Sequence, residues 1–184
     1  MTTTTLEPLA APVELAPRTE GLILSEVYQD IRGLTKHFLS QAKDVDPYQV
    51  LMVNGTPFNS LYWIMGHIVW SQHFLILRAL ADKDLEIPWF DRFERGSELM
   101  LDPRSESELP TVEEIMETMD RVHEESMTII RSLDVDALEE SNHLGLRFPA
   151  GDSRRVIIRH ALRHEPMHIG QITWLTKAAA GAGA

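Results

Sequence analysis

Apolar residues recur three and four positions apart in four segments of this chain, a period that is typical of amphipathic helices. The segments are residues 22–42, 59–81, 111–133 and 153–179. No segment has a convincing strand pattern, and the nearest approach, residues 145–149, is short. Four amphipathic helices of about 20 residues each predict an all-α fold, a four-helix bundle.

One apolar stripe on each helix is expected to face the core of the bundle. The first helix carries its stripe at Leu24, Val27, Ile31, Leu34, Phe38 and Ala42. The second carries Trp63, His67, Trp70, Phe74 and Leu77, and the third carries Val112, Ile115, Met119, Val122, Ser126, Ile129 and Leu133. Asn59 or Ser60, Thr111 and Ser153 are suitable N-cap residues for the last three helices.

The segments outside this pattern set the domain boundaries. We expect a disordered or extended N-terminal segment over residues 1–20, the bundle over residues 21–179, and a flexible tail over residues 180–184. The connection between the second and third helices, residues 82–110, is unusually long. Loops of this length are more often functional than idle, so we expect it to lie over a site.

Composition excludes several classes of function. The 184 residues include 28 acidic and 17 basic side chains, a net charge of −11, and no cysteine. Duplex binding needs a basic surface, so we expect no nucleic-acid partner, and the lack of cysteine excludes disulfides and thiolate ligands. No apolar run approaches the roughly 18–20 residues of a membrane span, and the first residues lack the pattern of a secretory signal. These features predict a cytoplasmic protein that uses no membrane.

Histidines on the inner stripes are the candidate chemistry. His160, His164 and His168 are spaced by four in the last helix, so they form one row, and two imidazoles one turn apart can chelate one ion. His67 lies in the middle of the apolar second helix. Three imidazoles from two helices would leave a coordination position for water or substrate, which is typical of a catalytic metal site.

Simpler interpretations exist for each of these residues. A lone histidine on an apolar stripe, such as His67, is more often a hydrogen-bonded core residue than a ligand. His160 suits a ligand, a neighbour of the ligands or a residue of the helix surface, and ligation is the less favoured of these. We expect His123 to pack in the core and His37, His73 and His143 to be solvated.

Residues 164–168 also match the zinc-protease motif His-Glu-x-x-His, in which the glutamate is the general base. Two features oppose a protease. The chain lacks the downstream third ligand of such enzymes, and Pro166 removes a helical hydrogen bond inside the motif. Glu165 remains a candidate for a catalytic base or for a contact behind the ligands.

Residues 59–68 place a tryptophan before a Gly-His pair, and residues 164–172 read His-Glu-Pro-Met-His-Ile-Gly-Gln-Ile. In this order, on the second and fourth helices, the two stretches resemble the motifs of the DinB/YfiT-like superfamily of metalloenzymes. The resemblance spans about residues 22–177 and includes the long second loop. Pro166 and Ile169 depart from the commoner choices, and these departures bear more on the substrate side of the site than on the ligands.

The resemblance implies an up-down-down-up bundle in which His67, His164 and His168 bind a divalent metal ion, zinc or nickel first, with iron or manganese as alternatives. Relatives include thiol-dependent S-transferases and a thiol-dependent isomerase, and similar domains occur in sulfoxide synthases of thiohistidine biosynthesis. It therefore implies a small-molecule substrate and a low-molecular-weight thiol as cosubstrate. Because relatives often pair, it also implies a homodimer.

A metal-dependent, thiol-dependent S-transferase is our leading hypothesis, because a metal ion lowers the pKa of a thiol beside it. A metal-dependent hydrolase that uses metal-bound water and a non-catalytic metal or small-molecule binding protein are the alternatives. Neutral imidazole is the form that binds metal, and free histidine has a pKa near 6.5. Affinity for the ion should therefore fall as the pH drops from about 7 towards 5, whereas a carboxylate site would lose affinity nearer pH 4.

Overall fold

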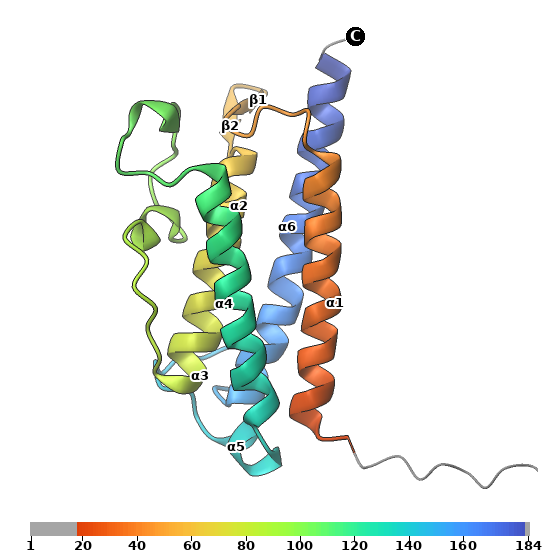
Figure 1. Cartoon of the computed structure of the whole chain (residues 1–184), viewed down its shortest axis with the longest axis vertical. Helices are drawn as coiled ribbons and strands as arrows, with labels where there is room; N and C mark the ends of the chain where they lie inside the picture. Colours follow the sequence, from red (N-terminus) through yellow and green to blue (C-terminus); the bar gives the residue numbers. More distant parts are fainter. Residues whose placement is uncertain (1–17, 183–184) are drawn as a thin grey trace, which may run out of the picture.

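A computed structural model describes residues 18–182, and it is mostly helical, which confirms the predicted all-α class. The long helices are α1 (Glu20–Gln41), α2 (Leu61–Gln72), α4 (Val112–Ser132) and α6 (Arg154–Ala182). Helices α1 and α2 each pack against both α4 and α6. In Figure 1, α1 and α6 run in one direction along the long axis, and α2 and α4 run in the other.

Side-chain caps fix where the helices begin. Ser60 rather than Asn59 caps α2, since its hydroxyl accepts a hydrogen bond from the backbone N–H of Trp63. Thr111 caps α4 in a reciprocal capping box with Glu114. Such caps satisfy backbone donors that lack a partner in the first turn, and each contributes about 1 kcal/mol to stability.

The inner face of α1 differs from the predicted stripe. Val27 and Leu34 are 43% and 47% exposed, whereas the side chains of Tyr28, Arg32 and Thr35 are buried. The prediction was therefore wrong at Val27 and Leu34, whereas Ala42 is buried and Leu24, Ile31 and Phe38 pack, partly buried, against the core as expected. The physical reason is that Arg32 forms an ion pair inside the bundle, and this contact turns the polar face of α1 inward.

The second helical run continues beyond α2 through a π-helical segment, η1 (His73–Arg78), and a last turn, α3 (Ala79–Ala81). Periodicity predicted the extent of this run but not its π-helical part. His73, expected in solvent, is fully buried: its Nε2 accepts a hydrogen bond from the backbone N–H of Leu85, and its ring packs edge-on against Phe90. The prediction of a solvated His73 was therefore wrong.

A short antiparallel hairpin precedes α2, where the sequence suggested no strand. Strands β1 (Leu51–Val53) and β2 (Thr56–Phe58) pair through a turn at Asn54 and Gly55. Both turn residues have positive φ, 50° and 77°, which is the geometry that Asn-Gly favours in tight hairpins. Residues 145–149 contribute only one isolated bridge, between Phe148 and Gly151.

The connections contain short helical turns. The 82–111 loop carries two 3-10 turns, η2 (Phe90–Phe93) and η3 (Pro103–Ser105), and η2 packs on α2. The connection to α6 carries α5 (Val135–Glu139). Helix α6 continues through Pro166 and extends three residues beyond its predicted end at residue 179.

Two expectations concern the ends of the chain and membranes. Most of the predicted N-terminal segment, residues 1–17, lies outside the described residues. Within residues 18–182, no helix is both long enough and apolar enough to cross a membrane.

Candidate metal centre

The structure brings His67 on α2 together with His164 and His168 on α6. One ring nitrogen from each of the three lies within 4.8 Å of the others, so the group could hold a metal ion. The Nε2 atoms of His164 and His168 are 3.4 Å apart, and the ring of His67 lies 5.0 Å from that of His168 between centroids. The three residues predicted from the sequence therefore converge on one point between the two helices.

Contacts on α2 fix the orientation of His67. Its ring stacks on Trp63 and on Trp70, at centroid distances of 4.6 and 5.5 Å. Its Nδ1–H donates to the carbonyl oxygen of Phe93 in η2, at 2.8 Å. Gly66 permits this approach, because a Cβ there would lie 2.2 Å from the ring of Phe93. The Nε2 of neutral His67 is consequently unprotonated and able to bind a metal.

His168 is oriented in the same way from α6. Its Nδ1–H donates to the amide oxygen of Gln171, at 2.7 Å, which leaves its Nε2 unprotonated in the neutral ring. This Nε2 faces the Nε2 of His164. Unprotonated imidazole nitrogens that converge in this way are the donor set that Zn²⁺ and similar ions accept, so the residues fit a divalent metal.

Burial keeps these imidazoles neutral. Burial lowers the pKa of His67 to about 4, and the neighbouring His168 adds to the shift. Burial, together with the neighbouring histidines, lowers the pKa of His164 to about 3. Burial also lowers the pKa of His168, although the hydrogen bond to Gln171 opposes the shift. All three rings are in the metal-binding form at neutral pH.

These pKa values move the expected pH window for metal release. Protons compete with the ion only near the pKa of the folded ligands, so affinity should stay level from pH 7 to about 5 and fall below that. The window is lower than the one expected from free histidine. The measurement is a competition titration with a chelator at each pH, on protein shown to be folded by circular dichroism. A loss of affinity that begins near pH 6.5 would show that the ligands titrate as exposed histidines.

The same shifts predict how the metal-free protein responds to acid. Histidines of the unfolded chain titrate near 6.5, whereas His67 in the folded protein titrates at about 4. Between these values the unfolded chain binds more protons, so stability falls as the pH drops from about 6.5 towards 4. Circular dichroism should therefore be used to check that the protein is folded at every pH of the metal-competition titration.

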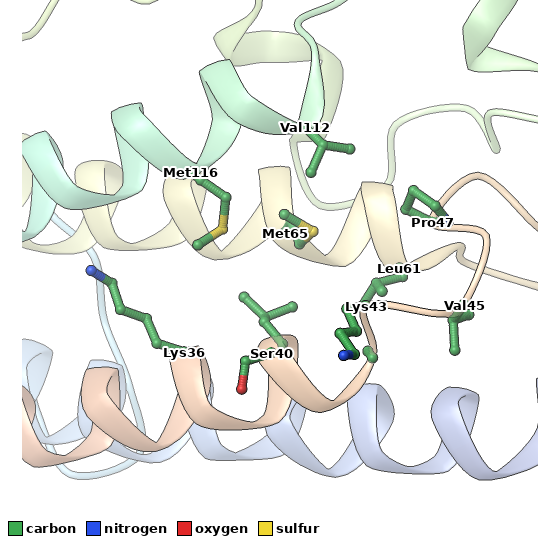
Figure 2. A pocket seen from close by; sticks show the side chains of 11 residues that line it. Lys36, Ser40, Lys43, Val45, Pro47, Leu61, Met65, Val112 and Met116 are labelled. Atoms are coloured by element: carbon green, nitrogen blue, oxygen red, sulfur yellow. The ribbon is translucent and has the colours of Figure 1, made fainter.

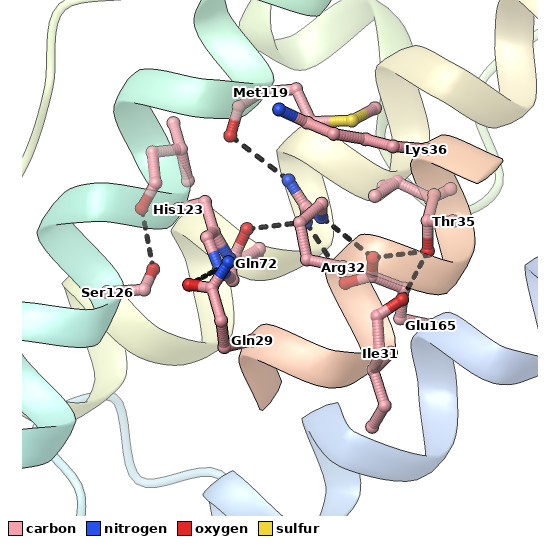
Figure 3. A network of polar contacts seen from close by, with 12 residues as sticks. Gln29, Ile31, Arg32, Thr35, Lys36, Gln72, Met119, His123, Ser126 and Glu165 are labelled. Carbon is pink, nitrogen blue, oxygen red and sulfur yellow. Dashed lines mark hydrogen bonds and ion pairs between the residues drawn. The ribbon is translucent and has the colours of Figure 1, made fainter. Parts of the chain in front are cut away.

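Glu165, between the two ligands of α6, belongs to a buried polar network (Figure 3). Its carboxylate accepts hydrogen bonds from Arg32, Nε at 2.8 Å and Nη2 at 3.0 Å, and from the hydroxyl of Thr35 at 2.7 Å. Burial alone would raise the pKa of Glu165, but the Arg32 guanidinium and Thr35 outweigh it and hold that pKa below the usual range. Glu165 is thus a charged partner of α1.

The network extends to two other helices. Arg32 also donates to the amide oxygen of Gln72 on α2, at 2.7 Å, and to the backbone carbonyl of Met119 on α4, at 3.1 Å. Gln72 in turn contacts Nδ1 of His123, which is buried as expected. Sequence reasoning missed Arg32. The available signal was the polar series Ser25, Arg32 and Thr35, which lies at helical spacing on the same face as Tyr28.

The remaining histidines lie apart from the cluster. His160 stacks on Phe148, at a centroid distance of 4.1 Å, and its ring is 5.8 Å from that of His164. It is not one of the three residues whose nitrogens converge. His37 and His143 are exposed, as predicted.

A cleft of about 500 Å³ adjoins the cluster. Its walls come from α2, η1 and α6 and from the two loops that precede α4 and α6, with His67 and His164 in the lining. A second hollow, of about 300 Å³, lies between α1, α4 and the start of α2 (Figure 2). Its lining is mostly apolar and includes Leu61, Met65 and Met116 but no histidine. The first cleft is therefore the one beside the candidate ligands.

Comparison with known proteins identifies one family. The family model of the DinB superfamily matches residues 28–172, a range that includes His67, His164 and His168. A search of curated proteins found no match to the chain.

Proposed function

Because this chain belongs to the DinB superfamily, we propose that it is a metal-dependent enzyme that transfers a small organic group to the sulfur of a low-molecular-weight thiol. The observation that carries the proposal is the convergence of three imidazoles, two buried and one half-buried, beside an open cleft. Three protein ligands leave room in the coordination sphere of a zinc-like ion, as in catalytic rather than structural sites.

His67, His164 and His168 would hold the ion. When bound, a divalent ion supplies Lewis acidity, which lowers the pKa of a thiol beside it so that thiolate is present at neutral pH. In the transfer, the thiol sulfur forms a bond to an electrophilic carbon, the leaving group departs with its electron pair, and the thiol proton passes to solvent. We propose zinc or nickel as the ion.

The remaining residues orient the ligands and shape the cleft. The carbonyl of Phe93 and the side chain of Gln171 select the tautomers of His67 and His168. The Arg32–Glu165 pair fixes the rotation of α6, because Glu165 lies between the two ligands of that helix. Trp70 and Phe74 stack on each other at 5.0 Å and form an apolar wall. Such walls exclude water from a reacting thiolate.

We also infer that the four long helices form the up-down-down-up bundle of the superfamily. The helix directions in Figure 1 and the packing of α1 and α2 against both α4 and α6 support this arrangement.

The test combines metal analysis with a reaction screen. Protein purified without an affinity tag is expected to contain close to one equivalent of a divalent metal. Turnover of an activated aryl halide or epoxide is expected to require both that metal and an added thiol. Each reaction is repeated with the His168→Ala variant, which should have lost activity.

Three results would contradict the proposal in different ways. Thiol-independent cleavage of an ester would favour a hydrolase. Stoichiometric metal without turnover across the screen would favour a metal-binding protein. Thiol-dependent turnover that survives His168→Ala would show that the reaction does not use this site.

A further inference from the structure

Within residues 18–182, the cleft beside the histidine cluster is lined by cationic but no acidic side chains. The described residues that line it include two arginines, Arg95 and Arg147, and three histidines, but no aspartate or glutamate. The whole chain carries 28 acidic and only 17 basic residues. A groove between α4 and the preceding loop, by contrast, is lined by one arginine, Arg121, and four glutamates, Glu86, Glu108, Glu114 and Glu117. In the described part of the chain, the cleft at the candidate site of this acidic protein is therefore lined by positive and no negative side chains, as is the hollow between α1, α4 and the start of α2, which Lys36 and Lys43 line.

Both guanidinium groups are available to a ligand. Arg95 is exposed in the loop that precedes α4 and forms no ion pair with any other residue from 18 to 182. Arg147 lies in the loop that precedes α6, and its contact with Asp152 is long, 3.3 Å, with the arginine side chain 81% exposed. Exposed pairs of this kind contribute little, so a ligand can replace the contact without a large loss.

Aromatic rings supply the rest of the lining. Trp70 on α2 and Phe74 on η1 stack in parallel, with ring planes 9° apart. Phe148, the neighbour of Arg147, stacks on His160. The lining of the cleft thus combines flat apolar surfaces, cationic side chains from two different loops, and two of the candidate metal ligands, His67 and His164.

We propose that this cleft binds a small organic carboxylate, with its apolar body against Trp70 and Phe74 and its carboxylate on Arg95 and Arg147. The guanidinium group presents its donors in a planar fork that matches a carboxylate, which makes arginine selective for this group. The inference deepens the proposed function, since it assigns the charge class of the molecule that reaches the metal site. The binding itself needs no metal.

The test uses two probes of nearly equal shape and different charge, 3-phenylpropionate and its amide, 3-phenylpropanamide. Their affinities for the metal-free protein are measured by calorimetry at low ionic strength. The carboxylate is expected to bind about tenfold more tightly than the amide, as expected for a charge-assisted contact. Added salt should reduce this preference, because the arginines are exposed.

Arginine variants locate the contact. Arg95→Ala and Arg147→Ala should each weaken carboxylate binding by about fivefold and leave amide binding unchanged. Arg159→Ala is the matched control, since Arg159 is exposed on α6 and does not line the cleft. Equal affinity for the two probes, binding of neither, or a preference that survives both substitutions would overturn the inference.

Measurements on the wild-type protein separate this inference from the proposed function. If metal binding or thiol-dependent turnover is absent but the carboxylate preference persists, the function is wrong and the anion site stands. If the metal-loaded protein turns over thiols but the arginine substitutions leave the preference of the metal-free protein unchanged, the function stands and the anion site is wrong.

Discussion

Replacing His168 with alanine is expected to lower the affinity for a divalent metal by about a hundredfold or more while the bundle stays folded. Loss of a contact that only orients a ligand typically costs about 10- to 100-fold in affinity, and loss of a ligand should cost at least as much. His168 contributes little to the apolar core, which consists of residues such as Ile64, Ile115 and Ile157. Affinity is measured by competition with a chromophoric chelator, and folding by circular dichroism.

His67 needs a different substitution, because its ring is part of an aromatic stack with Trp63 and Trp70. His67→Phe keeps the stack and removes the donor nitrogen, so it should also abolish tight binding. His160→Ala and His37→Ala are the controls. Both should retain the affinity for the metal, since neither residue belongs to the group of three whose ring nitrogens converge. Full occupancy in His168→Ala and His67→Phe would refute the assigned site. A large loss of metal affinity in His160→Ala would show that His160 also belongs to the metal site.

Glu165→Gln is expected to reduce the free energy of unfolding by about 3–5 kcal/mol at pH 7. The substitution leaves the guanidinium of Arg32, which is 1% exposed, buried without its counter-charge. An unpaired charge in a dry interior costs far more than the loss of an exposed ion pair. Urea unfolding, followed by circular dichroism and analysed at equal m-values, measures the change.

Glu106→Gln is the matched control, because Glu106 pairs with Arg92 at 2.5 Å on the surface, where both side chains are partly exposed. It should change stability by less than about 1 kcal/mol. The double variant Arg32→Met/Glu165→Leu should recover most of the stability lost in Glu165→Gln, since it removes both charges. Similar losses for Glu165→Gln and Glu106→Gln would show that the buried pair is not specially important.

The pH dependence of this pair has a definite sign. The pKa of Glu165 in the folded protein lies below the value of the unfolded chain. Its contribution to stability is therefore complete above the unfolded pKa and is lost as the pH falls through the folded one. The free energies of unfolding of the wild type and of Glu165→Gln should therefore become more similar as the pH falls into the acid range.

Periodicity predicted the helices because most of their buried residues are apolar. In α4, Ile115, Met119 and Val122 are buried, as the three-four pattern predicted. Two of the candidate ligands could also be predicted from the sequence. A four-residue spacing places His164 and His168 on one face of a helix, whatever that helix packs against. His67 required the family resemblance in addition, because a single histidine on an apolar helix does not reveal its partners.

The errors arose where polar contacts decide the packing. The stripe assigned to α1 assumed that apolar residues face inward, whereas the inward face is set by Arg32 and a partner on α6. No local pattern links these two residues. The prediction that His73 is solvated was wrong for a related reason. Its burial depends on Leu85 and Phe90, which belong to the loop that follows. The hairpin at Asn54-Gly55 had a clear turn signal, but three-residue strands are too short to show an alternating pattern.

The buried ion pair also has a consequence for synthesis. Arg32 leaves the ribosome 133 residues before Glu165. At about 5–20 residues per second, the wait is on the order of ten seconds. Until α6 emerges, α1 cannot close against α2 and α4 without enclosing an unmatched positive charge. The nascent half-bundle should therefore remain open, a form that chaperones can bind, and α6 should be the helix that completes folding.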